Sequence, residues 1–283
     1  MKDNLFDLSG RVIVITGAVG LLGRQHADAI ATAGGTPILL DLSLEPVEKL
    51  AKEIKTKYGV AAAGYAVDIT KENRVESNTK AILEKFGKID ALVNNAANNP
   101  KVKNHDGKIF SRLENFPLEV WNADVAVGLT GAFLCAKHYG TSISNNPDGG
   151  VILNISSDLG LIAPDQRLYQ RQDLPEDQQP VKPVTYSVVK TGLIGLTRYL
   201  ATYWPDRVRS NALCPGGVEE GQAEDFIKEV ITRIPMGRLA QANEYQGVLL
   251  FLLSEASAYL NGVILPMEGG NVQLYGRRAH MDP

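Results

Sequence analysis

Short apolar runs alternate along this chain with segments of helical spacing, and this alternation restricts the possible folds more than any other feature. Seven of the apolar runs are predicted to be β-strands. They cover Arg11–Thr16, Thr36–Asp41, Ala62–Asp68, Ile89–Asn94, Val151–Ile155, Val208–Leu213 and Gly262–Pro266. Strands without polar alternation are buried on both faces, which is typical of a parallel sheet covered by helices.

The segments between these runs are predicted to be helices. They cover Gly23–Ala33, Glu45–Tyr58, Lys71–Phe86, Pro117–Ser144, Thr185–Tyr203 and Glu244–Leu253. Connections between parallel strands are right-handed crossovers, so the expected α/β fold is a Rossmann-type, doubly wound sheet of about seven strands with helices on both faces. No repeat or linker divides the chain, and residues 1–283 are expected to form a single domain.

Two segments do not fit regular structure, namely residues 98–111 and residues 164–183. Loops of this length within a compact domain are usually functional or disordered. Both follow predicted strands, at the sheet edge where such folds bind ligands, so we expect insertions near the substrate pocket. A surface insertion without function is the alternative. Residues 271–283 form a polar C-terminal tail, which either reaches the site of a neighbouring subunit or frays.

Composition argues against several classes of protein. The chain has 29 Lys plus Arg against 32 Asp plus Glu and no basic run, so no nucleic-acid partner is expected. The two cysteines, Cys135 and Cys214, lack metal-ligand spacing, and no metal site is expected. No apolar stretch approaches the length of a membrane span, and Met1 to Gly10 lacks a signal core. A cytoplasmic location and no membrane partner are expected.

A glycine-rich turn follows the first predicted strand, with glycines at Gly17, Gly20 and Gly23. Such a turn lets the backbone approach a pyrophosphate, while the next helix directs its free N–H groups at the phosphates. Asp41 ends the second strand, where a carboxylate binds ribose hydroxyls and repels a 2′-phosphate by about 4 kcal/mol at roughly 4 Å. The turn contains no Arg or Lys to offset that repulsion. NAD is therefore the expected cofactor.

Tyr186 and Lys190 lie four residues apart and share one face of a predicted helix. A free tyrosine has a pKa of about 10 and is a poor base at neutral pH. Lowering that pKa by two units takes about 2.7 kcal/mol, which one partly buried ammonium contact supplies. The pair is thus expected to exchange a substrate hydroxyl proton while a hydride moves to or from nicotinamide.

Five motifs in register resemble the short-chain dehydrogenase/reductase family. They are the glycine turn, Asn94-Asn-Ala-Ala97, Ser156-Ser-Asp-Leu-Gly160, Tyr186-Ser-Val-Val-Lys190 and Cys214-Pro-Gly-Gly217, and the resemblance runs from about Leu8 to Gly270. It implies one dinucleotide-binding and catalytic domain, with Ser157, Tyr186 and Lys190 as catalytic residues. Ser157 is favoured over Ser156 because two residues and a glycine follow it.

The same resemblance implies which residues hold the cofactor. They are Gly17, Gly20, Leu22, Gly23, Asp41, Asp68, Ile69, Asn94, Ala96, Tyr186, Lys190, Gly217 and Val218. In this scheme Asp68 binds the adenine edge, Asn94 and Ala96 the adenosine ribose, and Lys190 the nicotinamide ribose. Gly217 and Val218 lie near the carboxamide.

Four departures from the family pattern qualify the resemblance. The middle glycine stands at Gly20 instead of Leu21, Gly128 replaces the asparagine that supports a proton-relay water, and Glu220 replaces a threonine. The fourth departure is the spacing of 29 residues between Ser157 and Tyr186, where the family usually has about a dozen. Water held by freed backbone carbonyls is one hypothesis for restoring the relay.

The amides of the 164–183 insertion, with Arg167, Tyr169 and Arg171, suit a polyhydroxylated or anionic substrate. Together with Tyr199-Leu-Ala, they resemble oxidoreductases of bacterial surface-sugar and flagellin-glycan pathways. The expected function is oxidation or reduction of a secondary alcohol or ketone on a small sugar-like molecule. A 3-oxoacyl or generic ketone reductase and a non-catalytic dinucleotide-binding sensor or scaffold remain alternatives. The helices 117–144 and 185–203 resemble those that pair family members into homodimers or homotetramers.

Overall fold

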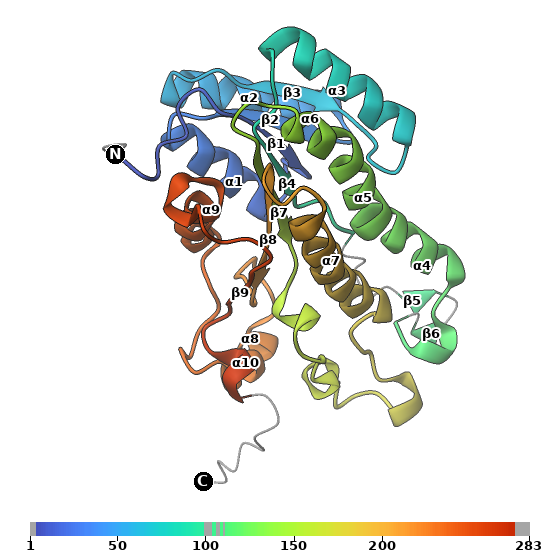
Figure 1. The fold of residues 1–283 in the computed structure, drawn as a ribbon. Coiled ribbons are helices and arrows are strands. Elements are labelled where there is room, and N and C mark those ends of the chain that lie inside the picture. The colour runs from blue at the N-terminus through green and yellow to red at the C-terminus, as the bar shows by residue number, and fades with distance from the viewer. Residues whose placement is uncertain (1–3, 99–103, 106–107, 110, 275–283) are drawn as a thin grey trace.

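The protein is built around one parallel sheet of seven strands, seen in a computed structural model that describes residues 4–98, 104–105, 108–109 and 111–274 (Figure 1). The strand order is β3-β2-β1-β4-β7-β8-β9. The strands are β1 (Val12–Thr16), β2 (Thr36–Asp41), β3 (Ala63–Ala66), β4 (Ala91–Asn94), β7 (Gly150–Ile155), β8 (Val208–Pro215) and β9 (Ile264–Met267). All neighbouring pairs are parallel, which confirms the predicted doubly wound α/β sheet.

Helices cover both faces of the sheet (Figure 1). One face is packed by α1 (Leu21–Thr32), α2 (Leu44–Tyr58) and α9 (Gln246–Leu253). The opposite face is packed by α3 (Glu72–Phe86), α7 (Val184–Tyr203) and a long helix that begins at Leu118. Side chains alternate along each strand: Ile13 and Ile15 of β1 belong to the first core, and Val12 and Val14 to the second. Burial on both faces explains why β1 is apolar at every position but its last.

The long helix runs from Leu118 to Ser144 and has irregular hydrogen bonding within it. It consists of α4 (Leu118–Val125), α5 (Gly131–Cys135) and α6 (Thr141–Ser144), joined by π-helical segments at Ala126–Thr130 and Ala136–Gly140. Length and a mean hydropathy of 1.2 would let this helix cross a membrane. Here it packs on β4 and α7, and core helices of globular proteins often have this composition. The π segments are relevant to the site because Gly128 lies in the first of them.

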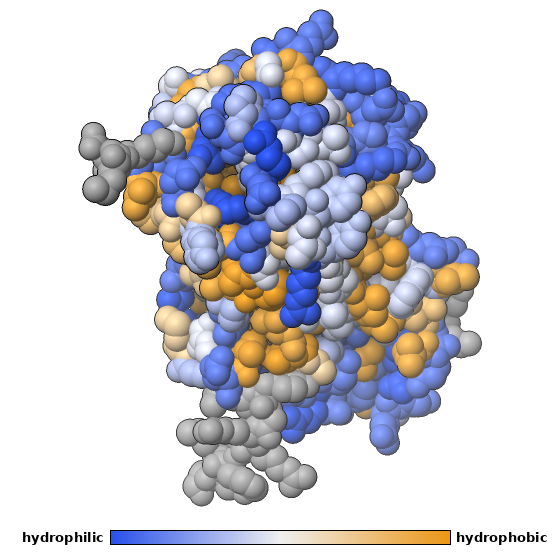
Figure 2. Space-filling view, in the orientation of Figure 1, coloured by the Kyte–Doolittle hydropathy of each residue, from blue (hydrophilic) through white to orange (hydrophobic). Residues whose placement is uncertain are grey.

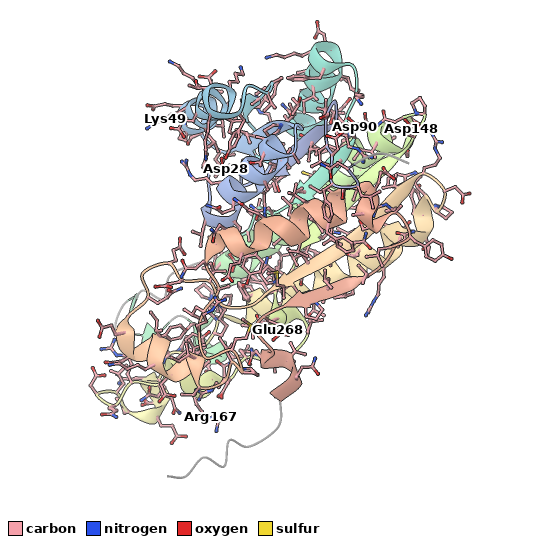
Figure 3. All side chains as sticks on the ribbon, turned by 90° about the vertical axis from the view of Figure 1, so that its left-hand side faces the viewer. Asp28, Lys49, Asp90, Asp148, Arg167 and Glu268 are labelled. Atoms are coloured by element: carbon pink, nitrogen blue, oxygen red, sulfur yellow. The ribbon has the colours of Figure 1, made fainter. Side chains whose placement is uncertain are left out.

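The strand order reverses beside β1, since β2 continues the chain on one side of it and β4 on the other. Ligands of doubly wound sheets bind at such a switch point, outside the carboxyl ends of the strands. In Figure 3, Asp90 and Asp148, which precede β4 and β7, lie at one end of the molecule. Arg167 and Glu268, which follow β7 and β9, lie toward the other. The latter end therefore carries the candidate site.

Two short strands and two short helices were not predicted from the sequence. The segment 98–111 contains an antiparallel pair, β5 (Asn104–His105) and β6 (Lys108–Ile109). Helix α8 (Glu224–Ile231) was missed because it is short and has no buried residue; it packs through Phe226 on Tyr169, with ring centroids 6.0 Å apart. Helix α10 (Asn271–Leu274) opens the predicted polar tail, and the rest of that tail lies outside the described residues.

Candidate active site

A cleft of about 2090 Å³ follows the carboxyl ends of the strands. Its wall is formed by the glycine turn, by residues that follow β2, β3, β4, β7 and β8, and by residues 162–169 of the segment after β7. The glycine turn and the residues that follow β2, β3 and β4 can hold a nucleotide. The segment after β7 faces Tyr186 and Lys190. A cofactor site and a substrate site are therefore parts of one continuous space.

Two glycines of the turn, Gly17 and Gly23, have no room for a side chain. Gly17 has a φ of +64°, and a β-carbon on it would lie 2.9 Å from the Cα of Ala96. A β-carbon on Gly23 would overlap the carbonyl oxygen of Gly17, so this glycine lets α1 start close to the turn. Gly17, Gly20 and Leu22 line the cleft, while Gly23 packs behind it. The geometry matches what a pyrophosphate requires at a helix N-terminus.

Asp41 ends β2 with its carboxylate directed at the glycine turn. Its Oδ2 accepts a hydrogen bond from the backbone N–H of Val19 at 3.2 Å, and Oδ1 accepts one from Leu42 N–H at 2.9 Å. A cation also lies nearby, since Arg24 Nε donates to the carbonyl of Val19 at 3.1 Å. Sequence reasoning missed Arg24 because it follows the glycine turn and belongs to α1.

The ends of β3 and β4 supply the other predicted nucleotide contacts. Asp68 and Ile69 line the cleft, and hydrogen bonds from Thr70 hold the pKa of the Asp68 carboxyl below its usual value. Ala96 lines it as well. Asn94 does not: its buried amide donates to Asn154 Oδ1 at 2.9 Å and to the carbonyl of Ala132. Its neighbour Asn95 lies at the cleft and ties the glycine turn to β4.

Ser157, Tyr186 and Lys190 come together although they belong to different elements. Tyr186 and Lys190 face the cleft from α7, and Ser157 caps the turn that follows β7. The Tyr186 hydroxyl donates to Ser157 Oγ at 3.4 Å, and Lys190 Nζ donates to the carbonyl of Ile155 at 2.8 Å. Ser156 faces the other way, donating to the carbonyl of Lys190 at 2.7 Å. Ser157 is thus the serine beside the phenol.

Burial shifts the ionisation of both side chains from α7. It raises the pKa of Tyr186, which a hydrogen bond to Ser157 lowers in part and the charge of Asp158 raises further. It lowers the pKa of Lys190 to about 8. Shifted ionisation of paired groups in a cleft is typical of proton-transfer sites. Lys190 Nζ lies 5.8 Å from the centroid of the Tyr186 ring, so the two side chains are neighbours in the cleft.

The wall formed after β8 contains Gly217 and Val218, both at the cleft. The carbonyl of Val218 accepts a hydrogen bond from Gln222 Nε2 at 2.7 Å, and Gln222 Oε1 accepts one from the backbone N–H of Glu220. Gln222 therefore braces the loop at the position where Glu220 replaces the threonine of the family pattern. Sequence reasoning did not single out Gln222.

The 164–183 insertion forms one side of the cleft and is held by its own ion pairs. Asp165 binds Arg167 at 2.7 Å and Arg233 at 2.9 Å, and Arg171 binds Asp173 at 3.0 Å. Arg167 and Tyr169 line the cleft, but Arg171 does not. Both arginines thus already have carboxylate partners. The insertion also meets the first one, since Ser111 Oγ accepts a hydrogen bond from Val181 N–H.

Three further residues of the cleft were not singled out from the sequence. Asp158 is buried and accepts hydrogen bonds from Ser157 Oγ at 2.8 Å and from Asn271 Nδ2 at 3.1 Å. Asn271 comes from the C-terminal helix α10, which only the fold brings here. The third, Lys182, lies four residues before Tyr186, a spacing that mirrors Lys190, but Pro183 between them obscured the relationship.

Comparison with known proteins agrees with this geometry. Residues 11–169 match the short chain dehydrogenase family, and residues 176–271 match the family described as enoyl-(acyl carrier protein) reductase. The chain belongs to the short-chain dehydrogenase/reductase family. It is accordingly an oxidoreductase that acts on alcohols or ketones of small molecules with a nicotinamide cofactor.

Several relatives resemble the chain over nearly its whole length. An NADP-dependent mannitol dehydrogenase from Alternaria alternata is 32% identical, with 95% of each chain covered. A 3-oxoacyl-[acyl-carrier-protein] reductase from Aquifex aeolicus is also 32% identical, covering 93% of this chain and 98% of its own. An NAD⁺-bound xylitol dehydrogenase structure is 27% identical with a TM-score of 0.79, covering 93% of this chain and 99% of its own.

Proposed function

We propose that this protein is an NAD-dependent dehydrogenase or reductase that acts on a secondary alcohol or ketone of a sugar or another polyhydroxylated small molecule. One observation carries the proposal: Ser157, Tyr186 and Lys190 face the same cleft into which the glycine turn and Asp41 open. A nucleotide bound along that turn would extend toward the phenol. Proton transfer and hydride transfer would then take place side by side.

The residues present fit a nicotinamide dinucleotide, because Gly17 and Gly20 line the cleft without side chains that would keep a pyrophosphate from the backbone. The cofactor residues that line the cleft are Gly17, Gly20, Leu22, Asp41, Asp68, Ile69, Ala96, Tyr186, Lys190, Gly217 and Val218. When bound, the nicotinamide accepts or supplies the hydride. Gly23 supports the cradle from behind, and Asn94 supports it through the core.

The three catalytic residues have separate tasks in this proposal. Tyr186 Oη takes the proton of the substrate hydroxyl during oxidation and returns it during reduction. Ser157 orients the substrate oxygen, since its hydroxyl hydrogen turns freely from Asp158 toward a new acceptor. Lys190 contributes positive charge beside the phenol and holds ribose hydroxyls. Ser157 and Lys190 are buried, which strengthens the electrostatic interactions that they make.

Asp41 supports NAD over NADP. A 2′-phosphate would meet a carboxylate whose oxygens already bind Val19 and Leu42, so the side chain is held in place. Named relatives divide on this point, with an NADP-dependent mannitol dehydrogenase and an NAD⁺-bound xylitol dehydrogenase. Two observations favour NADP. Several relatives, among them mannitol dehydrogenases from Alternaria alternata and Hypocrea jecorina, are named as NADP-dependent, and Arg24 binds the carbonyl of the same Val19.

Polar residues that line the substrate end support a polyhydroxylated substrate. They are Asn98, Asp158, Gln166, Tyr169, Lys182 and Asn271. Polar groups at this density match the hydroxyl groups of sugars more closely than the carbon atoms of an acyl chain. The acyl reductase among the relatives keeps 3-oxoacyl reduction as the second candidate. A non-catalytic dinucleotide sensor does not require a phenol, an ammonium and a serine together.

The test follows NADH absorbance with a panel of polyols, sugars, sugar phosphates and 3-oxoacyl thioesters. We expect turnover on a polyol or sugar, and Tyr186→Phe should abolish it while NADH still binds. Turnover restricted to acyl thioesters would favour the second candidate. Wild-type protein that binds NADH but turns over no member of the panel would favour the sensor.

We also propose a homodimer or homotetramer built on the long helices. Large hydrophobic residues are exposed on them, including Leu118, Phe133, Tyr199 and Tyr203. Figure 2 shows hydrophobic residues gathered on the side of the molecule where α4, α5 and α7 lie. Cys135 and Cys214 are free and buried, which agrees with a reducing, cytoplasmic location. Sedimentation analysis of wild type and Tyr199→Arg tests the assembly.

A further inference from the structure

The positive charge nearest to the Tyr186 ring belongs to Lys182, outside the Tyr-x-x-x-Lys pair. Its Nζ lies 3.8 Å from the centroid of the Tyr186 ring, whereas Lys190 Nζ lies at 5.8 Å. Lys182 lines the main cleft and also a small cavity of about 20 Å³ that borders Lys190 and Gly128. Two ammonium groups thus flank one phenol.

The 164–183 insertion holds Lys182 in this position. The backbone N–H of Lys182 donates to Gln166 Oε1, at the other end of the insertion, at 2.8 Å. Pro183 follows it, buried, and α7 begins at Val184. Because the proline ring fixes its own φ and restricts the residue before it, the backbone of Lys182 has little freedom to move away.

Lys182 has no carboxylate within ion-pair distance among the residues that the structure describes. Burial lowers its pKa, and the charge of Asp158 raises it in part. Both carboxylate oxygens of Asp158 are engaged, by Ser157 and Leu159 on one side and by Asn271 on the other. The face of the Tyr186 ring is therefore a principal neighbour of this ammonium.

We propose that Lys182 is a second active-site cation, which stabilises the ionised phenolate of Tyr186; this rests on the function proposed above. A cation over a neutral aromatic face is already attracted to it. The attraction grows when the ring carries a full negative charge, because two opposite charges then interact across a partly dry space. Lys182 therefore attracts the ionised ring more strongly than the neutral ring, which favours the phenolate. Lys182 acts on the reaction through Tyr186, as a positioning residue.

The surroundings of Tyr186 explain why a second cation is needed. Burial and the charge of Asp158 both oppose ionisation of the phenol. Lys190 donates to a carbonyl, and burial lowers its pKa to about 8. The charged or titratable groups around the phenol are Asp158 after β7, Tyr169 of the insertion, Lys190 on α7, Lys182, and Asp124 of α4 across the small cavity. Among the described residues, Lys182 is the cation closest to the ring, and its charge can offset the effects of burial and of Asp158.

The first test titrates the phenol directly. Tyrosine labelled with ¹³C at the ζ carbon is followed by NMR in the free enzyme and in enzyme saturated with NAD, with Tyr186→Phe identifying the signal. Lys182→Met should raise the midpoint by about one pH unit, or about tenfold in the ionisation constant. Lys182→Arg should retain most of the effect. Lys80→Met, on the exposed side of α3, is the matched control and should change nothing.

The second test measures kcat/KM for alcohol oxidation against pH. Because the phenolate is the base, the acidic limb of the profile should move to higher pH in Lys182→Met by the same amount. A rise in KM for anionic substrates only, with the acidic limb unmoved, would show that Lys182 binds a substrate anion instead. An unchanged midpoint for the phenol in Lys182→Met overturns the proposal even if no substrate has been found, since the titration requires no turnover.

Discussion

Gly128 and Val189 share one space between the long helix and α7. A β-carbon added to Gly128 would overlap Cγ1 of Val189 and would lie 3.6 Å from its Cβ and Cγ2. The space that the asparagine of the family pattern would need at position 128 is therefore occupied by the side chain of Val189, on the neighbouring helix. Val189 directly precedes Lys190.

This relationship predicts strong coupling between the two positions. Gly128→Asn should destabilise the protein by about 1–3 kcal/mol because the added side chain overpacks the contact. Val189→Ser should relieve the overlap. The double variant should therefore lose less free energy of unfolding than the two single variants lose together. Denaturant unfolding of wild type, the two single variants and the double variant measures these free energies. Additive effects would mean that the helices move apart instead.

The sheet and the reacting residues could be predicted from the sequence because their signals are local. Apolar runs mark each buried strand, and the glycine turn and the Tyr186–Lys190 spacing each lie within one connection or one helix. Their order along the chain was enough to place them at one edge of the sheet. The structure places Ser157, Tyr186 and Lys190 within one cleft, as the motif order predicts.

The missed features depend on contacts between distant segments. Asn271 reaches Asp158 from 113 residues away, and α8 is held by Phe226 against the insertion. Neither contact leaves a periodic pattern in the sequence. The predicted role of Arg167 and Arg171 in binding substrate depended on their charges alone, whereas Asp165 and Asp173 bind both side chains. Asn94 was assigned by motif, but its direction depends on Asn154 in the neighbouring strand.

His26 should make the protein sensitive to acid. The imidazole is fully buried on α1, and burial lowers its pKa to about 4, against a weaker raising effect of Asn95. Within the part of the chain that the structure describes, neither ring nitrogen meets a hydrogen-bond partner. From pH 6.5 down to about 4 the unfolded chain binds a proton that the folded one does not. Stability should fall by about 3 kcal/mol over that window.

Urea unfolding at a series of pH values measures the acid effect. His26→Leu should flatten the dependence between pH 6.5 and about 4, because the replacement cannot bind a proton. His138→Asn, which removes a histidine paired with Glu72, is the control and should leave the decline in place. An equal decline in wild type and His26→Leu would assign the acid sensitivity to other groups.

Lys190 should impose a stability cost that disappears at high pH. Burial lowers its pKa to about 8 in the folded protein, whereas the unfolded lysine has its usual value of 10.5. Between these values the unfolded chain holds more protons, so stability rises with pH relative to a variant without the amine. The difference between wild type and Lys190→Met should change by about 3 kcal/mol from neutral pH to 10.5. A difference that stays constant with pH would show that the amine is solvated.

Asp41 should determine the choice between NAD and NADP. In Asp41→Ser the carboxylate that faces a 2′-phosphate is removed, while a serine hydroxyl can still accept the Val19 N–H bond. The ratio of kcat/KM for NAD over NADP should fall at least about tenfold, because a charge repulsion at roughly 4 Å near a protein surface is worth about 4 kcal/mol, and a tenfold change requires only about 1.4 kcal/mol. Arg24→Ala in the same background should reduce NADP use again if its guanidinium meets the phosphate. Wild-type protein that uses NADP as well as NAD would contradict the assignment of the cofactor. An unchanged ratio of kcat/KM in Asp41→Ser would show that a residue outside β2 selects the cofactor.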